Sequence, residues 1–375
     1  SLFTNTTGTS NTAVGMSALL ANTTASNNTA VGYQAGYSNT TGANNVALGA
    51  FALDANTTAG SNTAIGRSSL GTNTTGGNNV ALGYQSLFFN TTASNNTAVG
   101  HQSLYANTTG TQNVAVGGGA LDANTTAYYN TAVGYISLSA NTTGERNTAL
   151  GQGSLFDNTT GDKNVAVGMS ALENNTTADN NTAVGYQAIL DNTTGAGNAA
   201  VGYQSLYANT TGTENSAFGK NALASNTTAS GNAAFGTFSA NNNTTGTGNA
   251  AFGGAIPGVT NATLMSNTTG SYNTAIGIAA LAQNTTASAN VAVGYRAGYT
   301  NTTGAQSNYF GREAGYSSNA NYCTMMGDQA GYASTGTKNT FIGYYAGGTI
   351  TSGASNTIIG GYNGNAGGLD IRTSS

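Results

Sequence analysis

The chain has 375 residues, of which only 8 are Lys or Arg and 12 are Asp or Glu, and it contains 55 Gly, one Pro, one Cys and no Trp. So few basic residues cannot neutralise a phosphate backbone, which excludes a nucleic-acid-binding surface. Apolar residues make up 38% of the chain and recur in strict order, so we expect a folded protein. No apolar run approaches the roughly 18 residues of a membrane-spanning helix, and we expect no membrane insertion.

One unit of 17 residues is repeated along nearly the whole chain. Almost every unit holds the motif Asn-x-Ala-apolar-Gly, and the closing glycine recurs every 17 residues from Gly15 to Gly253. After an insertion the series resumes at Gly277 and runs to Gly360 in steps of 16 or 17. Repetition of this kind decides the fold. We number positions from the leading Asn as 0, which places the closing Gly at position 4.

Breaks in the repeat divide the chain into four segments. They are regular repeats at 1–253, an insertion at 254–266, resumed repeats at 267–311, and variant Gly-Tyr repeats with a C-terminal transition at 312–375. The chain begins in the second half of a unit and its last residues form no evident stop, so we expect both ends to continue in a longer protein.

The repeated unit is typical of β-structure. A 17-residue unit is too short for a pair of helices, and a helix with Gly and Asn-Thr-Thr in every unit would be unstable. "NTAVG" indicates a strand ended by a Gly of positive φ, "SALLAN" indicates a second strand, and "NTTG" indicates a turn. The sequence predicts an all-β fold, a parallel β-roll or β-solenoid of about 21 turns spaced about 4.8 Å apart.

Constant positions are assigned to the interior and to ladders. We expect the apolar residue at position 3 and the Leu at position 8 to fill the interior, and we expect the Asn at positions 0 and 11 to stack as amide ladders. Glycosylation at every Asn-Thr-Thr is disfavoured because glycans about 4.8 Å apart in one column would collide. The residues assigned to these columns include Asn11, Asn28, Asn45, Asn22, Asn39, Asn56, Leu19, Leu53 and Leu70.

Small residues form a second constant set, with Ala at position 2 and Ala or Ser at position 7. A strand with one buried face varies on its other face. The constancy of the small residues therefore indicates the close approach of a second surface, and we expect the chain to associate with itself as a homotrimer. The alternative is that tight turns alone require small residues in a single coil.

The unit N-T-A-V-G-x-x-A/S-L resembles the repeat of the YadA-like heads of trimeric autotransporter adhesins. The longer pattern "NTAVGYQAGYSNTTGANNVALG" and the tail "GLDIRTSS" are similar to phage tail-fibre and collar proteins. The resemblance covers residues 5–360 and departs from the adhesin pattern in unit length and in the constant Asn-Thr-Thr. It implies a left-handed β-roll, intertwined or packed as a homotrimer. It also implies a structural shaft on a virion tail or cell surface that presents an element binding a host receptor or glycan.

Residues for catalysis or metal binding do not converge in the sequence. His101 is the only His, Cys323 is the only Cys, and the carboxylates are scattered over different units. We therefore predict no enzymatic activity, no cofactor and no metal site. Two alternatives remain open, namely an extracellular filament of monomeric solenoids and a tailspike-type polysaccharide depolymerase with carboxylates paired between chains.

Two interruptions of the repeat are candidate functional segments. After residue 295 the Leu at position 8 gives way to Gly followed by Tyr, at Gly298, Gly315 and Gly331, which predicts a changed core toward a distal segment. The insertion contains the only Pro and predicts a protruding contact loop. Its candidate contact residues are Ile256, Pro257, Val259, Leu264 and Met265.

Overall fold

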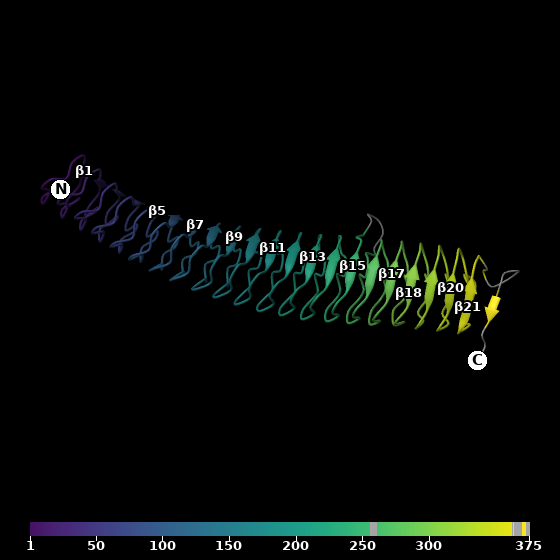
Figure 1. Ribbon diagram of the computed structural model, residues 1–375. Helices are drawn as coiled ribbons and strands as arrows, with labels where there is room; N and C mark the ends of the chain where they lie inside the picture. Colours follow the sequence, from purple (N-terminus) through teal and green to yellow (C-terminus); the bar gives the residue numbers. More distant parts are fainter. Residues whose placement is uncertain (256–260, 362, 364–369, 373–375) are drawn as a thin grey trace. The chain divides into compact units, whose positions relative to one another are not determined.

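The computed structural model shows an all-β chain in which short strands follow one another as the turns of a β-solenoid (Figure 1). It describes residues 1–255, 261–361, 363 and 370–372. These residues form 22 strands and no helix, and the chain divides into two compact units, Ser1–Asn181 and Thr182–Ser375. The predicted parallel β-solenoid with a 17-residue unit is confirmed, with about 20 turns.

The first unit contains ten strands of three residues each. Each strand pairs in parallel with the next, and equal positions lie opposite each other, as Ala30 lies opposite Ala47. The strands are β1 (Thr12–Val14), β2 (Thr29–Val31), β3 (Val46–Leu48), β4 (Thr63–Ile65), β5 (Val80–Leu82), β6 (Thr97–Val99), β7 (Val114–Val116), β8 (Thr131–Val133), β9 (Thr148–Leu150) and β10 (Val165–Val167).

The second unit repeats this arrangement and ends with one antiparallel strand. Strands β11 to β21 pair in parallel in chain order, and β22 pairs with β21 in the opposite direction. The strands are β11 (Thr182–Val184), β12 (Ala199–Val201), β13 (Ser216–Phe218), β14 (Ala233–Phe235), β15 (Ala250–Phe252), β16 (Thr274–Ile276), β17 (Val291–Val293), β18 (Asn308–Phe310), β19 (Thr324–Met326), β20 (Thr340–Ile342), β21 (Asn356–Ile359) and β22 (Asp370–Arg372).

The glycine at position 4 ends each three-residue strand of the regular turns. Gly100 has a φ of 137°, and a Cβ built on it would lie 2.5 Å from the carbonyl oxygen of Gly117 in the next turn. The positive φ and the close approach of the neighbouring backbone both require Gly. The predicted positive φ at this position is therefore confirmed.

The prediction of a second strand at "SALLAN" is wrong. Ser17 and Leu19 have φ values of 60° and 47°, in the left-handed region, so the backbone cannot be extended there. The segment instead makes two tight turns. One is closed by the Ala18 N–H, which donates to the Gly15 carbonyl at 3.4 Å, and the other by the Asn22 N–H, which donates to the Leu19 carbonyl at 3.3 Å.

The core is built from positions 2, 7 and 8, so the assignment of position 3 to the interior is wrong. Ala30 and Leu53 are each 1% exposed, whereas Val14 is 57% and Leu48 is 44% exposed. Strand side chains alternate between faces, and position 2 points inward while positions 1 and 3 point outward. Position 7 is buried too, as Ala18 and Ser69 are each 0% exposed. The small residues at positions 2 and 7 therefore lie in the interior of their own coil and do not form a contact surface for another chain.

Large and small core residues exchange places in the last turns. Position 2 holds Tyr309, Met325 and Phe341, each 0% exposed, where earlier turns hold Ala. A Cβ on Gly315 would lie 2.3 Å from the ring of Tyr309, so the Tyr ring occupies the space that Leu fills elsewhere. The position-8 residues of these three turns are Gly315, Gly331 and Gly347.

Candidate functional site

The Asn residues at position 11 form a buried amide ladder. Asn39 Nδ2 donates to Asn22 Oδ1 at 3.2 Å, and Asn56 Nδ2 donates to Asn39 Oδ1 at 2.8 Å. Asn39 also donates to the carbonyl of Gly42 in its own turn at 2.9 Å. These three side chains are at most 1% exposed, and their bonds join each turn to both neighbours in a medium where hydrogen bonds are strong.

The Asn residues at position 0 link turns in a different way. The backbone N–H of Asn28 donates to Asn11 Oδ1 at 2.9 Å, and that of Asn45 donates to Asn28 Oδ1 at 2.9 Å. Asn28 Nδ2 donates to the carbonyl of Gly42 at 3.0 Å. Each side chain therefore binds the backbone of the next turn rather than stacking only amide on amide.

The geometry of the Asn-Thr-Thr turn bears on glycosylation. The sequon Asn is the position-11 residue, and Asn56 is 0% exposed with both of its Nδ2 bonds made within the coil, at 2.8 Å to Asn39 and 2.9 Å to Ala59. A glycan on this nitrogen would break the ladder and has no space beside a fully buried amide. The structure therefore favours the ladder over glycosylation in the folded chain.

The structure describes two of the five candidate contact residues of the insertion. Ile256, Pro257 and Val259 lie outside the described residues. Leu264 is 0% exposed, and its N–H donates to the Ala280 carbonyl of the next turn at 3.0 Å, as the N–H of Leu53 donates to the Ser69 carbonyl at 3.0 Å. Its assignment as a contact residue is therefore wrong. Met265 follows it and is half-buried.

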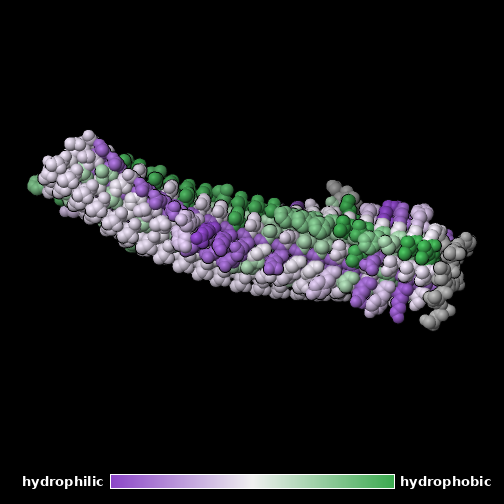
Figure 2. Space-filling model, viewed as in Figure 1, coloured by the Kyte–Doolittle hydropathy of each residue, from purple (hydrophilic) through white to green (hydrophobic). Residues whose placement is uncertain are grey.

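The position-3 side chains form an outward-facing apolar column, here named the outer apolar column. Its most exposed members are Val14 at 57% in the first unit and Ile359 at 58% in the second. Figure 2 shows hydrophobic side chains gathered in a stripe on one face of each unit. The column consists of Val14, Val31, Leu48, Ile65, Leu82, Val99, Val116, Val133, Leu150 and Val167 in the first unit and Val184, Val201, Phe218, Phe235, Phe252, Ile276, Val293, Phe310, Met326, Ile342 and Ile359 in the second.

An aromatic and charged surface lies at positions 5, 6 and 9 of the last turns. The rings of Tyr299, Tyr316 and Tyr332 stack in parallel with centroids 5.1 and 5.0 Å apart. Arg296 lies 5.5 Å from the Tyr299 centroid, and burial raises the pKa of Tyr316. Tyr and Arg are enriched where proteins bind partners. Sequence reasoning singled out the Gly-Tyr pattern here but not this surface.

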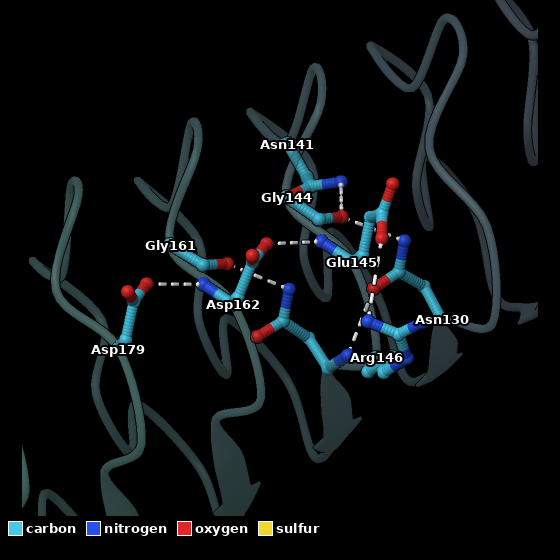
Figure 3. A network of polar contacts seen from close by, with 9 residues as sticks. Asn130, Asn141, Gly144, Glu145, Arg146, Gly161, Asp162 and Asp179 are labelled. Carbon is cyan, nitrogen blue, oxygen red and sulfur yellow. Dashed lines mark hydrogen bonds and ion pairs between the residues drawn. The ribbon is translucent and has the colours of Figure 1, made fainter.

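Acidic side chains at position 15 hold the backbone of the preceding turn (Figure 3). Asp162 Oδ1 accepts the N–H of Glu145 at 2.7 Å, and Asp179 Oδ1 accepts the N–H of Asp162 at 2.7 Å. Ser94 does the same in another turn, where its Oγ accepts the N–H of Gly77 at 3.0 Å. Across the described ranges, no group of three or more His, Cys, Asp or Glu is placed to hold a metal ion.

His101 and Cys323 are engaged in packing. The His101 ring stacks on Tyr84 with centroids 5.5 Å apart. Cys323 is buried, its Sγ donates to the Gly336 carbonyl at 3.4 Å, and burial raises the pKa of its thiol, so the thiol is protonated and unreactive. Among the residues that the structure describes, none belongs to a helix long and apolar enough to cross a bilayer.

These features define a β-solenoid repeat protein, with Ala, Leu and Asn columns inside and its variable positions outside. No protein-family model matches the chain, and a search of curated proteins finds no significant match. The function therefore has to follow from the solenoid and its surfaces.

Proposed function

We propose that the protein is the shaft of a homotrimeric fibre, a phage tail fibre or a related adhesin, on a virion tail or at the cell surface. Its role is mechanical, because it spaces and presents an element that binds a receptor or glycan on the host surface. We assign it no enzymatic step and no cofactor. The observation that carries the proposal is the uniform set of bonds that joins successive turns.

Backbone and side-chain bonds run from each regular turn to both neighbours. The Leu104 N–H donates to the Ala120 carbonyl of the next turn at 2.9 Å, and the Gln102 N–H donates to the Tyr84 carbonyl of the preceding turn at 3.0 Å. Buried backbone groups are thereby paired. Because turns contact only their neighbours, stability accumulates along the axis and turns can be added without changing the cross-section. These are the properties of a spacer.

The confinement of charged residues to the outer positions of the turn also supports a shaft. Charged residues stand at outer positions such as Arg67, Glu145 and Lys220, while the inward positions keep Ala, Leu and Asn. The resemblance of the unit to YadA-like heads and phage tail-fibre repeats adds to this and supports an oligomeric fibre over a filament of monomeric solenoids.

Electron microscopy of chains with different numbers of turns tests the proposal. Duplicating residues 63–130 adds four turns, and we expect rods longer by about 19 Å with unchanged width. Light scattering is expected to give three times the chain mass of 37.1 kDa. Compact particles whose length does not follow the number of turns would contradict the shaft. Rods with the mass of one chain would instead favour the monomeric filament.

A further inference from the structure

A lysine of the second unit lies at the end of a stack of exposed tyrosine rings. Tyr186 and Tyr203 are 38% and 47% exposed, and their rings stack with centroids 5.3 Å apart. Lys220 follows one turn later, with its Nζ 5.7 Å from the Tyr203 centroid and 5.8 Å from the Phe238 centroid. Within the ranges that the structure describes, Lys220 forms no ion pair. The rings therefore hold the ammonium group in place, while its hydrogen-bond donors stay available.

Arg296 is held in the same way further along the second unit. It follows β17, four turns after Lys220, which follows β13. Its Cζ lies 5.0 Å from the Tyr295 centroid and 5.5 Å from the Tyr299 centroid. Its Nε is buried, and it has no hydrogen-bond or ion-pair partner among the described residues. A guanidinium presents its donors in a planar fork that matches a carboxylate, so Arg296 is positioned to bind an anion that its own chain does not supply.

The carboxylates of the next turns are already paired. Arg312 Nε lies 3.0 Å from Asp328 Oδ1, and Arg312 NH1 lies 3.5 Å from Glu313 Oε2. Gln329 Nε2 also donates to Glu313 Oε2 at 2.9 Å. These two acids are therefore engaged with each other's neighbours and do not neutralise Arg296. The second unit thus carries two unpaired cations on a surface of Tyr rings and side-chain amides.

These groups belong to one surface, here named the aromatic edge. It consists of positions 5, 6 and 9 in the turns that follow β11 to β14 and β16 to β20. Contacts join the three positions, since Lys220 at position 5 lies over Phe238 at position 6, and Arg296 at position 6 lies over Tyr299 at position 9. Turns about 4.8 Å apart give the aromatic edge a length of about 43 Å. A surface of this length suits an extended polymer better than a small molecule.

We propose that the aromatic edge binds a linear acidic polysaccharide along the axis of the second unit, with carboxylates of the polymer at Lys220 and Arg296. The proposal rests on the proposed fibre and puts glycan binding on the shaft itself, beyond the element that the shaft presents. The two cations are about 19 Å apart, so both can pair with acid groups of one polymer chain. Between them, sugar hydroxyl groups can bond to Tyr hydroxyls and Gln amides, and sugar C–H groups can pack on aromatic rings. A polymer that carried charge alone would leave these rings and amides unused.

Titration calorimetry with polygalacturonate tests the proposal on the whole chain. This polymer carries a carboxylate on every sugar, and its fully methyl-esterified form has the same backbone without charge. We expect polygalacturonate to bind and the ester to bind about tenfold more weakly or less. Polyglutamate supplies the charge without sugars and is expected to bind no more tightly than the ester. The proposal is overturned if polygalacturonate does not bind, or if polyglutamate binds equally tightly.

Substitutions of three basic residues by Gln locate the site. Gln is compatible with each position, since other turns hold it there, at Gln152, Gln204 and Gln112. Lys220→Gln and Arg296→Gln are each expected to raise the dissociation constant for polygalacturonate about tenfold, the effect of one lost charge-assisted hydrogen bond. Lys163→Gln removes an equal charge from the first unit and is the matched control, which should bind as the unmodified chain does. Equal weakening by Lys163→Gln and Arg296→Gln would show that only net charge matters and would refute the aromatic edge.

Removal of a ring tests the part of the site that recognises sugars. Tyr203→Ala keeps every charge, and Ala50 occupies the same position in another turn. We expect it to weaken polygalacturonate binding about fivefold and to leave any residual polyglutamate binding and the circular dichroism unchanged. An unchanged affinity for polygalacturonate would contradict the role of the rings. If the polymer fails to bind while rods still lengthen with added turns, the fibre stands and only the aromatic edge is wrong.

Discussion

Asn107 makes three side-chain hydrogen bonds that run in both directions along the coil. Its Nδ2 donates to Asn90 Oδ1 at 3.0 Å and to the Gly110 carbonyl at 2.9 Å, and its Oδ1 accepts from Asn124 Nδ2 at 2.9 Å. The side chain is 0% exposed. If one Asn is removed, the groups that it paired stay buried and cannot form hydrogen bonds with water instead. Each ladder Asn therefore stabilises its contacts with both neighbouring turns.

We expect Asn107→Ala to destabilise its turn by about 1–3 kcal/mol for each buried polar group left unpaired. Thr109→Ala, on an exposed side chain of the same turn, should change stability by less than about 0.5 kcal/mol. Hydrogen exchange of the flanking amides measures the free energy of local opening, which suits a repeat protein better than a single unfolding midpoint. Equal protection in the two variants would show that the amide ladder contributes nothing.

The carboxyl group of Asp54 is expected to make the stability of the fold depend on pH. Burial raises the pKa of this carboxyl above its usual value. The folded state then binds the proton more tightly than the unfolded state, so its contribution to stability is present below the unfolded pKa, about 3.9, and is lost as the pH rises through the folded pKa.

We expect Asp54→Asn to raise the melting temperature at pH 7 and to change it little at pH 3. Asn is compatible with this position, since Asn241 occupies it in another turn. Thr58→Ala is the control and should keep the pH profile of the unmodified chain. A difference between Asp54→Asn and the unmodified chain that stays constant from pH 3 to pH 7 would refute this assignment.

At the scale of the strand and turn, the period and the Gly and Asn columns could be predicted, but the inward face could not. Positions 2 and 3 are both apolar, and a shift of one residue turns a strand over, so a three-residue strand leaves its orientation open. The sequence does contain a signal. Tyr309 replaces Ala in the same turn where Gly315 replaces Leu, and only residues that share one space exchange their volumes in this way.

The prediction of a second strand in each unit was wrong for a different reason. Leu104 has a φ of 52°, a conformation that costs a residue with a Cβ about 1–2 kcal/mol. Its side chain is 0% exposed, and burial of a Leu contributes about 1.5–3 kcal/mol. The local preference of "SLYAN" therefore indicates a strand, and only the contacts with neighbouring turns override it.

Tyr309 and Gly315 share one space in the core, so we expect substitutions at these two positions to compensate for each other. Tyr309→Ala is expected to destabilise its turn by about 3–5 kcal/mol because it leaves a cavity. Gly315→Leu alone should also destabilise, since its Cβ would lie 2.3 Å from the Tyr309 ring. The double variant restores the Ala and Leu pair of the regular turns and is expected to be more stable than either single variant. Additive losses, measured by hydrogen exchange of β18, would mean that the two residues do not share one space.

At the scale of the whole molecule, each turn contacts the next at a constant offset in sequence. Thr97 lies opposite Val114 in the parallel pairing of β6 and β7, and Asn113 binds Asn96 through its backbone N–H at 2.9 Å. An offset of 17 residues recurs in both the strand pairing and the ladders. The chain therefore specifies a turn and its repetition rather than a fixed length.

Deletion of one complete turn should consequently leave the fold intact. Removal of residues 97–113 joins Asn96 to Val114, so that β5 meets β7 with every column continuous. We expect the circular dichroism per residue and the melting temperature to be nearly unchanged. Removal of only residues 97–104 is the control, because it displaces every later column and places Asn opposite Leu. That variant should lose protection around the junction, since buried amides then face apolar neighbours. If both deletions were tolerated equally, packing between turns would not depend on register. The amide ladders and the inward Ala and Leu columns could then not be the features that hold successive turns together.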